Sequence, residues 1–127
     1  MSNLPTGPQP EDTISLEDGV TITTNWRDFI GPIMASENYI RAFYIPIDDI
    51  TSLAAFHQVK AVRAYLALED VTDPSTLKLA MVPVDDDGKD ILFCASEIAG
   101  KQSAIYDFTS PCPQSCDVDS PLFTGDI

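Results

Sequence analysis

Two apolar runs joined by a short polar connection constrain the fold of this chain more than any other feature of the sequence. Within Val59–Leu68 the alternate residues Val62, Ala64, Leu66 and Leu68 form a wholly apolar face, and the residues between them form a mixed one. Residues 77–84 are apolar on both faces, which is typical of a strand at the centre of a sheet. Because the connection over residues 69–76 is too short for a helical crossover, we predict that the two runs pair antiparallel.

The residues that follow this pair, 85–90, predict a tight turn, because Asp-Gly between apolar runs is a strong signal for chain reversal. Their acids also raise the question of a calcium loop. With Gly88 at the sixth position of such a loop, Pro83 would be its first ligand and Cys94 its twelfth, and neither residue suits that role. We therefore interpret residues 85–90 as a solvated turn.

The region before the strand pair predicts a helix that begins near Ser15 and ends or kinks at Gly31-Pro32. Ser15 with a carboxylate three residues later, at Asp18, has the form of a capping box. Gly19 and the β-branched residues after it oppose the helix. Apolar residues nevertheless recur at steps of three and four and form one stripe: Leu16, Val20, Thr23, Trp26, Ile30 and Ile33 or Met34.

The remaining segments complete the predicted order of elements. Residues 39–45 are aromatic and β-branched enough for a strand, and residues 48–56 open with two acids that suit the first turn of a helix. Shorter apolar stretches at 91–95 and 104–108 predict further strands. This order predicts an α+β protein: a mostly antiparallel sheet with two helices packed on one face.

The two ends of the chain are punctuated by proline. Residues 1–12 predict a disordered lead-in, because so few apolar groups cannot offset the entropy lost on ordering. We expect a single domain over residues 13–127, with an irregular tail that contains proline and cysteine from about residue 109.

The charge of the chain limits the partners that it can bind. Its formal net charge is −13, and all seven basic residues lie between Arg27 and Lys101. So acidic a chain is a poor ligand for nucleic acid or an anionic membrane, whereas a basic partner is compatible with it. The N-terminus shows neither a basic region nor an apolar run that would form a secretory signal, so we expect a cytoplasmic protein.

The segment 111–117, Pro-Cys-Pro-Gln-Ser-Cys-Asp, is the sharpest local feature of the sequence. Two thiols in a loop that packs the tail against the domain are the simplest interpretation. A disulfide between Cys112 and Cys116 is a second, because Pro113 helps the segment to turn. Redox chemistry is a third, although three residues separate the cysteines where thiol–disulfide motifs have two.

A zinc site is a fourth interpretation of the same segment. Cys112 and Cys116 would be two of its ligands, and Cys94 and His57 would complete it only if folding brings them close. The partner motif that usually accompanies such a pair, a second Cys-x-x-Cys or a His-x-x-x-His, is absent from the sequence. We therefore predict no cofactor and retain zinc as an alternative.

Other residues with chemical potential have simpler interpretations. His57 is the only histidine, and its position at the end of a predicted helix suits an imidazole on electrostatic grounds alone. Arg41 and Arg63 lie on neighbouring predicted strands, where we expect them to meet the chain's own acids. A set of aromatic residues is expected to be in the core or partly buried: Trp26, Phe29, Phe43, Tyr44 and Tyr65. No phosphate-binding loop or nucleophile elbow occurs in the sequence.

Several segments of the chain, taken in order, match a known pattern. They are Arg41-Ala42-Phe43-Tyr44-Ile45-Pro46, Val62-Arg63-Ala64-Tyr65-Leu66-Ala67-Leu68, Val82-Pro83-Val84-Asp85 with Gly88-Lys89-Asp90, and Tyr106-Asp107-Phe108 with Pro111-Cys112-Pro113-Gln114-Ser115-Cys116. Together they resemble an uncharacterised family of small bacterial proteins that end in a Pro-Cys-Pro-x-x-Cys motif. The resemblance spans residues 15–122. It implies a cytoplasmic bacterial protein and brings no activity, cofactor or catalytic residue.

These observations favour a non-enzymatic interaction or ligand-binding domain, which acts through its sheet face or through the tail that carries the cysteines. The partner would be a protein, a small molecule or a second copy of the chain paired through an uncovered strand. The alternative is a thiol- or metal-dependent activity centred on Cys112 and Cys116.

Overall fold

The computed structural model describes residues 4–7, 11–34, 39–95 and 103–126, and its centre is the predicted strand pair. β2 (Val59–Leu68) and β3 (Leu77–Asp85) pair antiparallel from Leu68 opposite Leu77 to Val59 opposite Asp85, with a bulge between Val59 and Ala61. The 3₁₀ turn η1 (Pro74–Thr76) lies in their connection. The antiparallel prediction is confirmed.

β3 is central, as its two apolar faces predict. β2 lies along one edge, and on the other edge the backbones of Met81 and Tyr106 exchange hydrogen bonds of 2.9 and 2.7 Å. The N–H of Ile91 also donates to the carbonyl of Pro83 at 2.8 Å. The result is that four consecutive residues of β3, Met81 to Val84, are buried.

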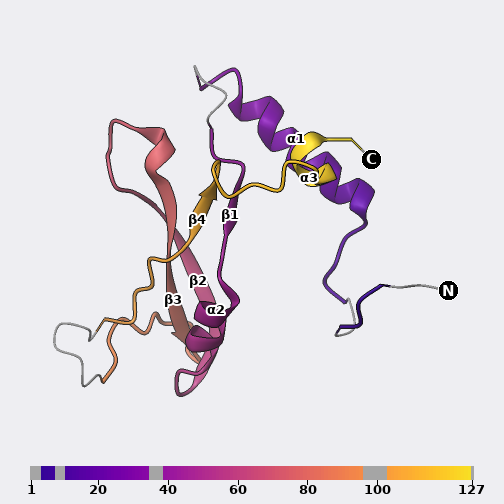
Figure 1. Cartoon of the computed structure of the whole chain (residues 1–127). Coiled ribbons are helices and arrows are strands. Elements are labelled where there is room, and N and C mark those ends of the chain that lie inside the picture. The colour runs from indigo at the N-terminus through magenta and orange to yellow at the C-terminus, as the bar shows by residue number, and fades with distance from the viewer. Residues whose placement is uncertain (1–3, 8–10, 35–38, 96–102, 127) are drawn as a thin grey trace.

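The helix α2 (Ile47–Ala54) packs against β2 and β3 and closes the core of this part of the molecule. Leu53 of α2 is fully buried, and Val82 and Pro83 of β3 expose no more than 2 % of their surface. Asp48 and Asp49 occupy its first turn, where carboxylates interact favourably with the helix dipole. We refer to α2, β2, β3 and the segment 103–109 as the body (Figure 1).

The helix α1 (Leu16–Ile30) forms a separate arm that crosses the top of the molecule (Figure 1). The hydroxyl of Ser15 accepts a hydrogen bond of 3.0 Å from the N–H of Asp18, so the predicted cap is confirmed. Gly19, which disfavours a helix by propensity, lies against the C-terminal segment. A Cβ there would lie 3.3 Å from the side chain of Leu122, so glycine permits a close approach of the C-terminal segment.

The tail is more regular than the sequence analysis expected. It contains a strand, β4 (Ser110–Cys112), which pairs antiparallel with β1 (Ala42–Tyr44), and a short helix, α3 (Pro121–Thr124), which packs on α1. The signals for α3 are present in the sequence: the hydroxyl of Ser120 caps its first turn, Pro121 occupies N1, and Gly125 ends it at φ +84°. The prediction of an irregular tail from about residue 109 is therefore corrected at residues 110–112 and 121–124, because proline both starts this helix and is tolerated in the two-stranded ribbon.

The further strands predicted at residues 91–95 and 104–108 are reduced to single bridges. These join Phe93 to Ser103 and Met81 to Tyr106. Each stretch is too short to extend its pairing beyond one residue pair. The disordered lead-in predicted for residues 1–12 lies partly outside the described residues, and those that are described are exposed.

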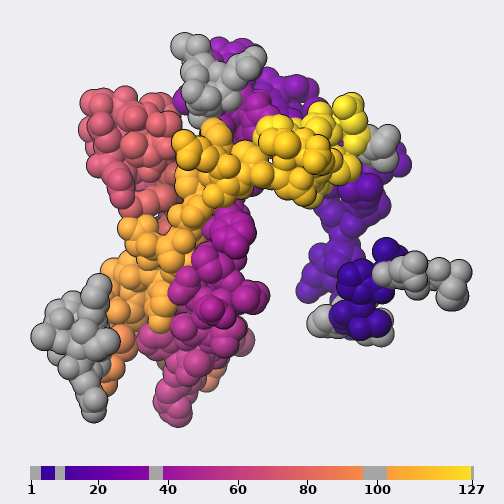
Figure 2. Space-filling view, viewed as in Figure 1, coloured from indigo at the N-terminus to yellow at the C-terminus, as the bar shows by residue number. Residues whose placement is uncertain are grey.

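The chain is thus an α+β protein with antiparallel strand pairing, as predicted. The body and the arm are joined through β1 and the C-terminal tail. In the space-filling view the arm and the body form two limbs of an open arch (Figure 2).

Candidate functional site

The cysteine-bearing turn of the tail is closed by a covalent bond. Cys112 and Cys116 form a disulfide, and their Cα atoms lie 4.8 Å apart. The turn between them is held by a hydrogen bond of 2.9 Å from the N–H of Ser115 to the carbonyl of Pro111. Cys112 is 2 % exposed and Cys116 is half-buried. With both sulfur atoms in the bond, neither is available as a thiolate nucleophile or metal ligand.

This turn holds the arm to β1. The N–H of Arg41 donates to the carbonyl of Cys112 at 2.7 Å, and the Arg41 guanidinium lies between two aromatic rings, 4.8 Å from that of Tyr39 and 4.6 Å from that of Phe123. Arg27 on α1 donates to the carbonyl of Leu122 at 2.6 Å. Cation–π contacts and a charged donor therefore join three segments that are distant in sequence. We call the disulfide turn with these contacts the clasp.

The clasp borders two cavities. One, of about 250 Å³, lies between α1, β1 and α3 and is lined mainly by apolar groups, with Arg41, Asp117 and both half-cystines at its wall. The other, of about 550 Å³, lies on the side of Pro111, Pro113 and Gln114. Arg41 is already engaged by the two rings, so the smaller cavity presents an apolar surface with one carboxylate and no nucleophile paired with a base.

The four residues considered for zinc are not brought together. Cys94 lies in the segment after the 85–90 turn, where its thiol donates to the carbonyl of Ser103 at 3.6 Å, and His57 is exposed just after α2. Within residues 4–7, 11–34, 39–95 and 103–126, no group of three or more His, Cys, Asp or Glu side chains is placed to hold a metal ion. The acids of the 85–90 turn instead accept backbone hydrogen bonds: Asp85 accepts from Asp87 and Lys89.

Asp90 joins two side chains of β2, Arg63 and Tyr65. Its carboxylate accepts hydrogen bonds from the Tyr65 hydroxyl and from the Arg63 guanidinium. The Tyr65 hydrogen bond, followed by that of Arg63, lowers the pKa of Asp90, and the same hydrogen bond raises the pKa of Tyr65. Because a raised pKa keeps the phenol protonated, Tyr65 acts here as a donor that fixes the 85–90 turn to β2. Arg63 was expected to pair with one of the chain's own acids, and it forms an ion pair with Asp90.

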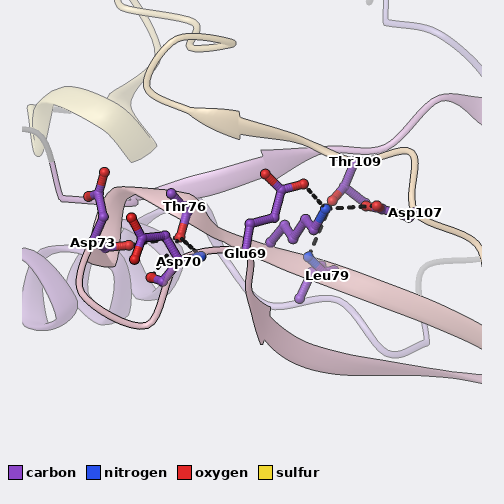
Figure 3. Close-up of polar contacts among 8 residues, drawn as sticks. Glu69, Asp70, Asp73, Thr76, Leu79, Asp107 and Thr109 are labelled. Carbon is purple, nitrogen blue, oxygen red and sulfur yellow. Dashed lines mark hydrogen bonds and ion pairs between the residues drawn. The ribbon is translucent and has the colours of Figure 1, made fainter.

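A second polar cluster closes the far end of the strand pair (Figure 3). Lys78 of β3 forms ion pairs with Glu69 and, at 2.7 Å, with Asp107, and these contacts raise the pKa of Lys78. The hydroxyl of Thr109 accepts from the N–H of Leu79 at 3.3 Å. The side chains of Glu69 and Asp107 are 66 % and 54 % exposed. This cluster is therefore a solvent-exposed contact that links the segment 103–109 to β3.

The largest departure from expectation is on α1. Ile22, Trp26, Phe29 and Ile33 expose 57, 40, 64 and 63 % of their surface. They fall at steps of four, three and four residues, so they line one side of the helix and of the turn that follows it. We call these residues the α1 stripe. The side of α1 that packs inward is a different one, with Gly19 and Val20 buried and Thr23 and Ile30 half-buried.

The α1 stripe was not predicted from the sequence because α1 is apolar on two sides. The expected inward stripe and the exposed one share Trp26 and Ile33, and either fits a helical period. The exposed stripe at 22, 26, 29 and 33 advances by four, three and four residues, so its spacing fits a helix as well as that of the other stripe does. The expectation that the aromatic residues are in the core or partly buried is corrected for Phe29 and for Tyr44, which is 60 % exposed.

A smaller apolar area lies on the strand pair. On the apolar face of β2, Leu66 is 75 % and Leu68 45 % exposed. α2 is only eight residues long, so it covers only part of a strand pair of nine to ten residues. In the described part of the chain no second strand pairs with the outer edge of β2.

The described helices include none that is long and apolar enough to cross a membrane. Comparisons of the chain with protein-family models, with curated proteins and with solved structures find no match in any of the three. The resemblance to the bacterial family with the Pro-Cys-Pro-x-x-Cys motif therefore stays a prediction.

Proposed function

We propose that this chain is a non-enzymatic interaction domain whose docking surface is the α1 stripe. The observation that carries the proposal is the exposure of four large apolar side chains in one row, 40–64 % each, on a helix that the body does not cover. Contiguous apolar surface of this kind marks interaction sites on soluble proteins, since its burial in a complex removes apolar groups from water.

The centre of the stripe is held rigidly before any partner binds. The indole N–H of Trp26 donates to the carbonyl of Ile40 at 2.8 Å, and the rings of Trp26 and Phe29 have centroids 6.4 Å apart. A fixed aromatic pair loses little side-chain entropy on binding, and aromatic residues dominate the energy of many interfaces. The stripe therefore has the features of a preformed anchor for an apolar protein surface.

The charged groups support a protein partner over nucleic acid or a membrane surface. Four of the basic side chains are engaged within the chain: Arg27 by Leu122, Arg41 by two rings, Arg63 by Asp90 and Lys78 by two acids. Few cations are therefore left to contact phosphates, which supply most of the affinity for nucleic acids and anionic lipids.

A photoreactive side chain at position 29 tests this function. Phe29 is replaced by a benzoylphenylalanine, the chain is irradiated in cells that express it, and adducts are detected by mass. We expect an adduct of discrete mass. The matched control is the same substitution at Val71, which is 87 % exposed in the β2–β3 connection and should give none. Absence of an adduct at position 29, or the same adducts at both positions, would contradict the proposal.

The clasp supports a second candidate, a thiol-dependent activity centred on Cys112 and Cys116. A disulfide that joins residues four apart beside an apolar cavity has the form of a redox-sensitive closure. We further propose a cytoplasmic location. Cytosolic reductants keep most thiols reduced, so a disulfide in that compartment is expected to be open most of the time. In that compartment the clasp would be a dithiol that closes under oxidation.

Alkylation of free thiols in the purified chain, with intact mass measured before and after reduction, tests this candidate. One alkylated cysteine before reduction, Cys94, and three after it would support a closure that responds to redox conditions. Extra native mass that a chelator removes would instead support the metal alternative. If the Cys112→Ser and Cys116→Ser variants match the parent in thiol reactivity and metal content, neither activity belongs to this segment.

A further inference from the structure

Arg41 is a half-buried cation that no acid among the described residues neutralises. The chain carries 20 acids against seven lysines and arginines, and both Arg63 and Lys78 pair with acids of the chain. Within residues 4–7, 11–34, 39–95 and 103–126, Arg41 forms no ion pair and its side chain donates no hydrogen bond. Because a buried charge is costly without a counter-charge, a group from outside the chain is suited to supply one.

Two rings hold the Arg41 guanidinium in place and leave its hydrogen-bonding capacity free. Its central carbon lies 4.8 Å from the centroid of the Tyr39 ring and 4.6 Å from that of the Phe123 ring, and Tyr39 is buried. A guanidinium that stacks on aromatic rings keeps its N–H donors in its own plane, where they form a fork that matches a carboxylate. Arg41 is therefore oriented before any ligand binds.

The charged end of Arg41 lies at the wall of the smaller cavity beside the clasp, since Phe123, on which it packs, lines the same cavity. The volume of this cavity is about 250 Å³. A water molecule takes up about 30 Å³ in the liquid, so the cavity has room for about eight non-hydrogen atoms. It is thus smaller than the sites of about 300–1,000 Å³ that bind drug-sized ligands, and its size suits a molecule no larger than an amino acid.

A carboxylate and an apolar surface complete the wall. Asp117 lines the cavity, and its carboxylate accepts a hydrogen bond of 3.2 Å from the N–H of Asp119, which leaves further acceptor sites on its oxygens. Ala42, Leu122 and the two half-cystines supply apolar lining. One positive and one negative group at the wall of a small apolar cavity match a ligand that carries both charges and an apolar body.

The net charge of −13 favours such a ligand over a simple acid. A small carboxylic acid would be repelled by the field of the whole chain, whereas an α-amino acid at neutral pH has no net charge and is not repelled. Its two charged groups also satisfy both Arg41 and Asp117, while an acid would leave the Asp117 carboxylate facing a second negative charge.

We propose that this cavity binds a small apolar α-amino acid. The Arg41 guanidinium takes the carboxylate of the ligand, Asp117 takes its ammonium group, and Leu122, Phe123 and the disulfide contact its side chain. The site is separate from the α1 stripe, so the proposal goes beyond the interaction function and does not depend on it.

Titration of the isotopically labelled full chain, with its disulfide intact, tests the proposal by nuclear magnetic resonance. The probes are leucine, leucinamide, which lacks the carboxylate, and 4-methylpentanoate, which lacks the ammonium group. We expect leucine to shift the amide signals of β1 and of residues 112–124. Each analogue should bind at least about tenfold more weakly than leucine, because it lacks the hydrogen bonds of one charged group.

Variants of the two charged residues separate their roles. Asp117→Asn should weaken leucine binding at least about tenfold and leave 4-methylpentanoate binding unchanged, because only leucine carries an ammonium group. Asp119→Asn is the matched control: Asp119 is an exposed acid two residues away that does not line the cavity, and the variant should bind leucine like the parent. Arg41→Lys keeps the charge and loses the fork, so it should weaken binding of both carboxylates and not that of leucinamide.

Absence of shifts with leucine in β1 and residues 112–124 would overturn the proposal. Equal affinities for the three probes would overturn it too, since they would show an apolar cavity that does not recognise the charged ends. So would equal losses in Asp117→Asn and Asp119→Asn, which would reduce Asp117 to a general effect of charge. This last comparison decides the matter even if Arg41→Lys disrupts the clasp. The adduct expected at position 29 needs no amino acid, so either proposal can fail while the other stands.

Discussion

The body and the arm use similar apolar sequences in opposite ways. In the body, β3 is apolar on both faces and has neighbours along both edges and an adjoining helix, so Met81 to Val84 are buried. In the arm, α1 is apolar on two sides, and one of them is buried where α1 packs on α3, while the α1 stripe stays exposed. Apolar content alone does not decide burial; the number of neighbouring segments does.

The way in which each region is held follows from this difference. The body is stabilised by a continuous core around Leu53 and Val82. The arm is attached by separate contacts of the clasp: the disulfide, the Arg27 hydrogen bond and the rings around Arg41. A region that is held by a few specific contacts can detach while the core of the body stays folded. Substitutions in the arm and in the body should therefore have separate effects.

The largest effect is expected from Leu53→Ala, which removes a fully buried side chain from the body. Truncation of a buried leucine lowers the free energy of unfolding by about 2–5 kcal/mol, because apolar contacts are lost and a cavity remains. Phe29→Ala in the arm, at 64 % exposure, should change the free energy of unfolding of a single copy by less than about 0.5 kcal/mol. Urea denaturation of samples dilute enough to sediment as one copy measures both values. Equal losses in the two variants would show that the arm is part of the same core.

The next effect concerns the clasp. Replacement of both Cys112 and Cys116 by serine frees a loop of five residues, and the chain-entropy model assigns to so short a loop about 2 kcal/mol. We expect the loss to be local. Hydrogen exchange should become faster in α1, β1 and α3, while protection of β2 and β3 is retained. Faster exchange in β3 as well would contradict the separation of arm and body.

The body was predictable from the sequence because its signals are local and agree with one another. The alternation over residues 61–68, the polar connection and the Asp-Gly turn each indicate the same antiparallel pair, and the structure has it from Val59 to Asp85. The α1 boundaries followed likewise from Ser15 at the start and Gly31 at the end. Periodicity and caps are properties of neighbouring residues, so they can be read without the tertiary fold.

The arm was less predictable because its packing depends on residues far along the chain. Which side of α1 is covered is decided by Leu122, about a hundred residues away, and no pattern within α1 encodes that contact. Arg41 was expected to meet an acid and instead lies between two rings that belong to different segments. Exposure of the α1 stripe is therefore a property of the fold that the helix period alone does not determine.

A smaller effect is expected at the start of the arm. Ser15→Ala removes the side-chain acceptor for the N–H of Asp18 and should cost about 1 kcal/mol. Thr21→Ala is its control in the same helix: the Thr21 hydroxyl donates to the carbonyl of Glu17, which already lies within the helix, so its loss should be near neutral. Thermal unfolding followed by circular dichroism gives both shifts. A Thr21→Ala loss as large as that of Ser15→Ala would show that the cap is not what fixes this end of α1.

The smallest effect lies in the body and depends on pH. The hydrogen bonds from Tyr65 and Arg63 lower the pKa of Asp90 in the folded chain, so Asp90 stabilises the fold above its unfolded pKa of about 3.9 and this contribution is lost as pH falls through the folded pKa. The pKa of Tyr65 is raised by the same bond, so its contribution is present below about pH 10 and is lost at higher pH.

Asp90→Asn should therefore be less stable than the parent at neutral pH and should approach it in acid, where the parent's Asp90 is protonated as well. Comparison of urea midpoints for the two chains at pH 7 and at a pH below the folded pKa of Asp90 isolates this group from the other carboxylates, since these titrate in both. Because Arg63 is 45 % exposed, the difference is small, and an equal difference at both pH values would show that the ionised pair does not stabilise the 85–90 turn. The emission of Trp26 should be the same in the two chains at neutral pH. A change there would mean that the arm depends on the polar contacts of the body, and the division between a self-sufficient core and a clasped arm would then fail.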